Sequence, residues 1–261
     1  MKMSKVFYID LQKCTGCRDC QIACKDEFCG NTWLPYAAEQ PEIGQFWINV
    51  TEKERGAGSH VRVSYVPVIG AQTEAIRNYA PEVLMDRDDG LIVIEPEKAK
   101  GRKDLAEKFE GVYWNEDLQI PQGCCGCAQL LDDEDSPIRT PRCVDSCPVD
   151  VIRFGEESEF DLENAERLDP ESNVYYKELP KTFIAATVYD PDEMEIIEGA
   201  TVTAKSDTNS YETTTDIWGD FWLKEIPADD YTVKIEKDGK IQEMNVSTKE
   251  KDQGLPDIPL R

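Results

Sequence analysis

The chain has one histidine, few basic side chains and no long apolar run. Among its 261 residues, 29 Lys plus Arg stand against 53 Asp plus Glu, and the formal net charge is -24. A nucleic-acid binder gains affinity by neutralising phosphates, so this charge argues against DNA, RNA and anionic membranes as partners. The N-terminus lacks the apolar stretch of a secretory signal, and no segment approaches a membrane span. We therefore expect a cytoplasmic protein, although a partner with an export signal could carry it elsewhere.

Cysteine is missing from the chain after Cys147, and the lone His60 lies outside every cysteine group. An isolated histidine is more often a surface or core residue than a ligand, so we assign it no role. Secreted disulfide scaffolds are short and lack a sufficient core, whereas this chain is long enough for about two domains. The ten cysteines therefore indicate metal chemistry rather than disulfide bridges.

The first cysteine group has the C-x2-C-x2-C-x3-C spacing of bacterial ferredoxins, at Cys14, Cys17, Cys20 and Cys24. Three closely spaced thiolates on a tight loop can bind three irons of one cubane. The fourth, on the following helix, then points toward a second cluster. Gly16 permits the tight turn.

The second group keeps both outer pairs of this motif but has a longer middle: Cys124, Cys127, Cys143 and Cys147, followed by Pro148 as in ferredoxins. If the pairing crosses as in two-cluster ferredoxins, eight thiolates bind two 4Fe-4S clusters. The first cluster then takes Cys14, Cys17, Cys20 and Cys147, and the second takes Cys124, Cys127, Cys143 and Cys24.

Structural zinc is the main competing interpretation, because paired C-x2-C units also form tetrahedral zinc sites. The run of four cysteines fits a cubane better. Cys29 and Cys125 are left over, and we expect both to be buried, inert thiols.

Other side chains near the cysteines have two explanations each. Four basic residues could offset cluster charge or simply be exposed: Arg18, Lys25, Arg142 and Arg153. Three aromatic residues could shield clusters from water, although core packing is the better explanation: Tyr8, Trp114 and Phe154.

A degenerate repeat of the first motif occurs later in the chain. Residues 9–20 align with residues 94–105, and the ligand positions there hold Ala99, Arg102, Leu105 and, at the fourth, Phe109. Short apolar runs predict strands at residues 6–9, 91–94, 112–114 and 151–154. We expect an α+β, ferredoxin-like domain over residues 1–180, with a second unit lacking a cluster at about residues 61–120.

The last part of the chain alternates apolar and polar residues, as in Ala200, Val202 and Ala204, which predicts half-buried strands. Residues 215–221 and 230–233 resemble the Cna-B or carboxypeptidase-regulatory-like β-sandwich. Residues 181–261 contain no nucleophile-base pair and no set of metal ligands. We expect them to form a small sandwich used for docking or structure.

As a whole, the sequence resembles the iron-sulfur subunits of the DMSO reductase family of molybdenum enzymes. It is most similar to the small subunits of pyrogallol-phloroglucinol transhydroxylases and related aromatic hydroxylases. The resemblance rests on the cysteine run and on residues 90–101, 113–116, 127–134 and 141–143. It implies a non-catalytic electron-transfer subunit bound to a large molybdopterin-containing subunit that acts on polyhydroxylated aromatics.

The sequence departs from this family in having no cysteine between about Val66 and Gly111. We therefore expect two clusters rather than three or four, which leaves electron exchange with an external carrier open. Two other hypotheses remain: a free-standing ferredoxin-like shuttle, and a zinc-stabilised interaction protein without redox activity. Iron, sulfide and zinc analysis after anaerobic purification separates the last of these from the others.

Overall fold

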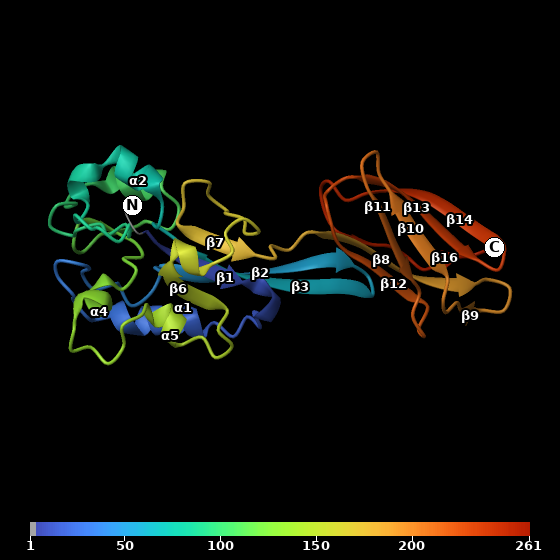
Figure 1. Cartoon of the computed structure of the whole chain (residues 1–261), viewed down its shortest axis with the longest axis horizontal. Coiled ribbons are helices and arrows are strands. Elements are labelled where there is room, and N and C mark those ends of the chain that lie inside the picture. The colour runs from blue at the N-terminus through green and yellow to red at the C-terminus, as the bar shows by residue number, and fades with distance from the viewer. Residues whose placement is uncertain (1–3) are drawn as a thin grey trace. The chain divides into compact units, whose positions relative to one another are not determined.

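The computed structural model describes residues 4–261 as a mixed α/β protein with few helices and several sheets (Figure 1). The described residues form two compact units. Unit 1 comprises residues 4–52 and 65–179, and unit 2 comprises residues 53–64 and 180–261. Within residues 4–261, no helix is long and apolar enough to cross a membrane.

The central sheet of unit 1 has three strands in the order β6-β1-β7. Strand β1 (Lys5–Asp10) pairs antiparallel with β6 (Ile152–Glu156) and parallel with β7 (Val174–Lys177). All residues of β1 after Lys5 are buried. Through this strand, residues 5–10 pair with two segments from residues 152–177.

The other elements before residue 160 are short helices and two hairpins. The α-helices are α1 (Asp19–Phe28), α2 (Glu74–Tyr79), α3 (Lys103–Lys108), α4 (Ala128–Asp132) and α5 (Arg142–Asp145). The 3-10 turns are η1 (Leu11–Lys13), η2 (Pro81–Val83) and η3 (Glu157–Glu159). The hairpins pair β2 (Ile48–Ala57) with β3 (His60–Ile69) and β4 (Tyr113–Asn115) with β5 (Ile120–Gln122).

Three of the four predicted strands of unit 1 are confirmed, as β1, β4 and β6, with shifts of one or two residues at their ends. The fourth, at residues 91–94, is wrong: its residues are buried, but the segment forms only an isolated bridge between Ile94 and Leu84. The side-chain amide of Gln72 explains the difference. Gln72 donates to the Ile92 carbonyl at 2.8 Å and accepts from the Ile92 N–H at 3.3 Å, so it replaces a neighbouring strand.

Unit 2 contains two sheets around one apolar core. One sheet has the order β11-β10-β13-β14, and in the other β8 pairs with β12, β15, β16 and β9. The strands are β8 (Thr182–Asp190), β9 (Glu195–Ile196), β10 (Thr201–Lys205), β11 (Ser210–Thr214), β12 (Asp220–Ile226), β13 (Asp230–Lys237), β14 (Lys240–Ser247), β15 (Gln253–Gly254) and β16 (Ile258–Pro259).

The alternation in residues 200–235 is confirmed as strand structure. In β10 and β13 the apolar residues are fully or nearly fully buried, and their polar neighbours lie further out: Val202 and Ala204, then Tyr231, Val233 and Ile235. This pattern packs one face of the sheet into the core.

The tip of the β2–β3 hairpin, residues 53–64, packs within unit 2. From the sequence we expected these residues in the first domain. Arg55 is buried and forms a two-pronged ion pair with Asp252, with Nε–Oδ2 and Nη2–Oδ1 distances of 2.8 and 2.6 Å. His60 is 1% exposed, with Nε2 3.4 Å from Asp220 Oδ1. The lone histidine is thus a core residue of this unit.

Candidate functional site

Four of the predicted cysteine ligands lie around one small cavity in unit 1. Cys14 and Cys17 come from the loop before α1, Cys20 from its first turn, and Cys147 from the turn after α5. The cavity encloses about 330 Å³ between atoms, open solvent included. Cys17 is exposed and Cys20 is buried, so this first group reaches the surface at Cys17.

A left-handed turn shapes the loop of this first group. Gly16 has a φ of +71°, and Arg18, which precedes α1, has a φ of 68°. A Cβ on Gly16 would lie 2.4 Å from the Tyr65 ring. Any larger residue would therefore have to displace the ring as well as adopt a conformation that only glycine takes readily.

The other four predicted ligands lie around a second cavity of about 290 Å³. Cys24 comes from α1, Cys124 and Cys127 from the loop before α4, and Cys143 from α5. All except Cys124 are buried. The structure thus brings together the same two sets of four cysteines that crossed pairing requires, and their role as iron ligands stays a prediction.

Burial disfavours negative charge on these thiols. It raises the pKa of Cys20 to about 12 and that of Cys124 to about 12. Burial, followed by the charges of neighbouring cysteines, also raises the pKa values of Cys24, Cys127 and Cys143 well above the usual range. Thiols must lose their protons to bind metal, so four thiolates in so small a space need a bound cation. The donor set therefore suits a cationic iron cluster.

Backbone amides point at several of these sulfurs. The N–H groups of Gly126, Arg142 and Val151 lie 3.4, 3.4 and 3.2 Å from the Sγ atoms of Cys124, Cys127 and Cys147, respectively. Such hydrogen bonds favour the thiolate and tune the electronics of a metal site. They strengthen the fit of both cysteine groups to a cluster.

The cysteine groups are not arranged around a single metal ion. Across residues 4–261, no three His, Cys, Asp or Glu side chains converge as one ion requires. Zinc draws its sulfur ligands to about 2.3 Å. A cubane spaces its thiolates more widely, because each thiolate binds a different iron atom.

All four basic residues near the cysteines have other partners. Arg18 alone among them lines a cysteine cavity. The partners are Val50 and Glu52 for Arg18, Gln45 and Pro41 for Lys25, Asp145 for Arg142, and the ring of Tyr8 for Arg153. Each of these four side chains therefore has a bonding partner other than a cysteine.

The three aromatic residues named from the sequence line neither cysteine cavity. Tyr8 stacks on Phe160 and Phe154 packs on Phe7, at centroid distances of 5.1 and 4.9 Å. Trp114 donates its indole N–H to Glu116 at 2.9 Å. Packing and local hydrogen bonds account for these residues.

The aromatic wall of the second cavity, Phe28 and Trp47, was not predicted from the sequence. The two ring centroids are 4.6 Å apart, and both side chains are almost fully buried. Trp47 lies just before β2, far from any cysteine motif, so no spacing could have identified it. The leftover Cys125 is buried, as expected, and also lines this cavity. Cys29 lines neither cavity and is only partly buried, so the expectation of a buried thiol is wrong for it.

In the degenerate repeat, apolar side chains fill the space around the positions that align with the cysteines. Ala99 and Leu105 are fully buried in a separate core of residues from 71 to 112, and Phe109 packs against it. Arg102 instead pairs with Asp104 at 2.9 Å and with Glu82. This region contains a packed apolar core rather than a cavity ringed by sulfur.

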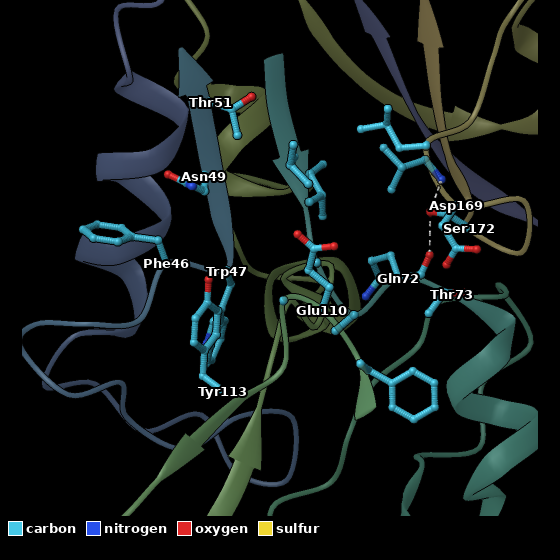
Figure 2. A pocket seen from close by; sticks show the side chains of 18 of the residues that line it. Phe46, Trp47, Asn49, Thr51, Gln72, Thr73, Glu110, Tyr113, Asp169 and Ser172 are labelled. Atoms are coloured by element: carbon cyan, nitrogen blue, oxygen red, sulfur yellow. Dashed lines mark hydrogen bonds between the residues drawn. The ribbon is translucent and has the colours of Figure 1, made fainter. Parts of the chain in front are cut away.

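A third, much wider cavity lies beside this core and encloses about 1400 Å³, open solvent included. Trp47 and Ile69 line both this cavity and the second cysteine cavity. Figure 2 shows Trp47 beside Tyr113 at one wall and Gln72, Thr73 and Ser172 at the other. Polar groups of the second wall are bonded to one another, because Ser172 Oγ donates to the Gln72 carbonyl at 2.9 Å.

Sequence comparisons place the chain among known proteins. A family model for the carboxypeptidase regulatory-like domain matches residues 184–260. The pyrogallol hydroxytransferase small subunit of Pelobacter acidigallici is 32% identical over 97% of both sequences. The formate dehydrogenase subunit beta of Megalodesulfovibrio gigas is 26% identical over 75% of this sequence and 93% of its own.

A subunit of the anaerobic dimethyl sulfoxide reductase of Escherichia coli is 26% identical over 57% of this sequence and 72% of its own. Likeness to the first of these relatives extends over nearly the full length of both proteins. The chain therefore belongs to the iron-sulfur (beta) subunits of the DMSO reductase family of molybdenum enzymes.

Proposed function

We propose that this protein binds two 4Fe-4S clusters and conducts electrons for a large molybdopterin-containing subunit. The observation that carries the proposal is the convergence of eight cysteines, in two sets of four, on two separate cavities. Cys14, Cys17, Cys20 and Cys147 would hold the first cluster. Cys24, Cys124, Cys127 and Cys143 would hold the second. When bound, such clusters accept and release single electrons.

The residues of this protein would set the conditions for that exchange. The first group includes the exposed Cys17, whereas the second is enclosed by apolar side chains such as Phe28 and Ile48. Exclusion of water and backbone N–H donors to sulfur both adjust the potential of a cluster. Two clusters in such different surroundings would form a short electron path with unequal potentials.

The fold supports a ferredoxin-like domain over residues 1–180. Strand β1 leads into the first cysteine loop and pairs with β6, which follows the last cysteine. The repeat at about residues 61–120 would be a second such unit whose cluster has been replaced by apolar packing, as around Leu105. Two clusters per chain, rather than three or four, follow from this replacement.

Residues 181–261 would form a docking or structural module. The match to a carboxypeptidase regulatory-like domain at residues 184–260 and the two-sheet core of unit 2 support a β-sandwich without catalytic groups. We further propose that the complex acts on polyhydroxylated aromatics, by analogy with the pyrogallol hydroxytransferase of Pelobacter acidigallici. Its location in the cytoplasm is proposed from the sequence.

Anaerobic co-expression of this protein with the product of the neighbouring open reading frame tests the proposal. A complex with about eight iron and eight sulfide per copy of this chain, plus molybdenum and pterin, is the expected result. Zinc in place of iron would overturn it. A monomer loaded with iron that reduces several acceptors without a partner would favour the free-standing shuttle instead.

A further inference from the structure

The indole N–H of Trp47 is buried and has no hydrogen-bond partner within residues 4–261. The side chain is 2% exposed. Tryptophan Nε1 can only donate, and a buried donor without an acceptor is destabilising. Trp114, by contrast, has Glu116 as its acceptor. The position of Trp47 therefore calls for an acceptor.

Two cavities adjoin the Trp47 ring, and they differ in the hydrogen-bond acceptors that they could provide. The wide cavity is partly open to solvent, but Nε1 is shielded from solvent, so bulk water does not satisfy it. The second cysteine cavity is enclosed, and Trp47 forms its wall together with Phe28, Ile48 and Ile69. Acceptors in that space would be sulfur atoms.

We propose that Trp47 Nε1–H donates a hydrogen bond to a sulfur atom of the second cluster. This inference rests on the proposed function, because it requires a cluster between Cys24, Cys124, Cys127 and Cys143. Reduction adds negative charge to the sulfurs, so a nearby N–H dipole stabilises the reduced form more than the oxidised form. Trp47 thus raises the potential of this cluster through a direct contact with it.

The first cluster would not share this effect. Its cavity is lined by Val50, Pro67, Pro148, Val149, Val151, Ile152 and the loop residues, and by no tryptophan of the described residues. Removing the Trp47 N–H should therefore change one potential and leave the other unaltered.

Trp47→Phe in the anaerobically purified complex tests the inference, since it keeps an aromatic wall and removes the donor. Redox titration followed by electron paramagnetic resonance should show one cluster with a more negative potential. A tenfold smaller equilibrium constant for reduction corresponds to about 59 mV for one electron, and we expect a shift of up to this size. In protein with ¹⁵N-labelled indole, nuclear coupling between that cluster and one tryptophan nitrogen should disappear in the variant.

A matched variant and the nitrogen coupling separate the hydrogen bond from packing. Trp218→Phe makes the same chemical change at a side chain that is 68% exposed, and it should keep the wild-type potentials. Phe28→Leu alters the same wall without touching an N–H, so any potential shift that it causes should leave the coupling between the cluster and the tryptophan nitrogen intact. Equal potentials in Trp47→Phe and wild type, with full iron content in both, would overturn the inference alone. Absence of iron from the wild-type protein would instead overturn the proposed function.

Discussion

Residues 14–24 and residues 99–109 align in sequence, but the surroundings of the two loops differ. Gly16 and Gly101 occupy matching positions and have φ values of +71° and +82°. In the first segment, the cysteines face two cavities. In the second, Ala99 and Leu105 are buried in an apolar core. The comparison teaches that one loop conformation can lie beside cysteine-lined cavities in one segment and be held by apolar packing in another.

Loss of a cysteine should have the largest effect. Cys143→Ala should reduce iron from about eight to about four per chain, because the second cluster loses a buried ligand. Cys125→Ala is the matched control, since Cys125 is buried and lines the same cavity without a ligand role. Iron and sulfide analysis measures both. Full iron in Cys143→Ala, or equal losses in the two variants, would contradict the assignment.

Shortening the side chain of Leu105, which aligns with Cys20, should lower stability and leave the iron content unchanged. Leu105→Ala removes a fully buried side chain and should lower the free energy of unfolding by about 2–5 kcal/mol. Cys20→Ala, at the equivalent place in the first segment, should lose iron instead. Anaerobic denaturant titration with iron analysis distinguishes them. Iron loss in Leu105→Ala would mean that the repeat also supports a cluster.

Substitution by alanine should destabilise the protein more at Gly16 than at Gly101. Gly101→Ala should cost about 1–2 kcal/mol, because alanine resists the left-handed conformation but meets no atom within 4 Å. Gly16→Ala adds a contact of 2.4 Å with Tyr65, so its cost should exceed that of Gly101→Ala by about 1–2 kcal/mol. Thermal unfolding measures the difference. Equal costs would show that the Tyr65 ring moves aside freely.

The smallest effect concerns the ion pair between Arg87 and Asp89, which lie within the repeat. Burial alone raises the pKa of Asp89, but hydrogen bonds from Arg87 at 2.6 and 3.0 Å bring the pKa below its usual range. This stabilisation is present above the unfolded pKa of about 3.9 and is lost as pH falls through the lower folded value.

Asp89→Asn should therefore destabilise the protein by about 1 kcal/mol at neutral pH. It should also flatten the loss of stability below about pH 4. Chemical denaturation at several pH values measures this. A variant that loses stability in acid as steeply as wild type would contradict the role of Asp89.

The sequence predicted what depends on spacing and periodicity. The two cysteine groups, the strands β1, β4 and β6, and the alternation in β10 and β13 all follow from local pattern. Features that depend on contacts between distant segments were not predicted. Gln72 replaces a strand partner of Ile92 from twenty residues away, and Trp47 reaches the second cavity from outside every motif. No local signal carries such information.

Unit 2 is built from two separate segments of the chain, which are synthesised at different times. The ribosome produces residues 53–64 well before residues 180–261, which complete their packing. Until then Arg55 has no Asp252 to neutralise it, and His60 has no core around it. The growing polypeptide therefore carries an unfinished hairpin while the cysteine-bearing region is being made, and the second unit closes only after residues 180–261 have been synthesised.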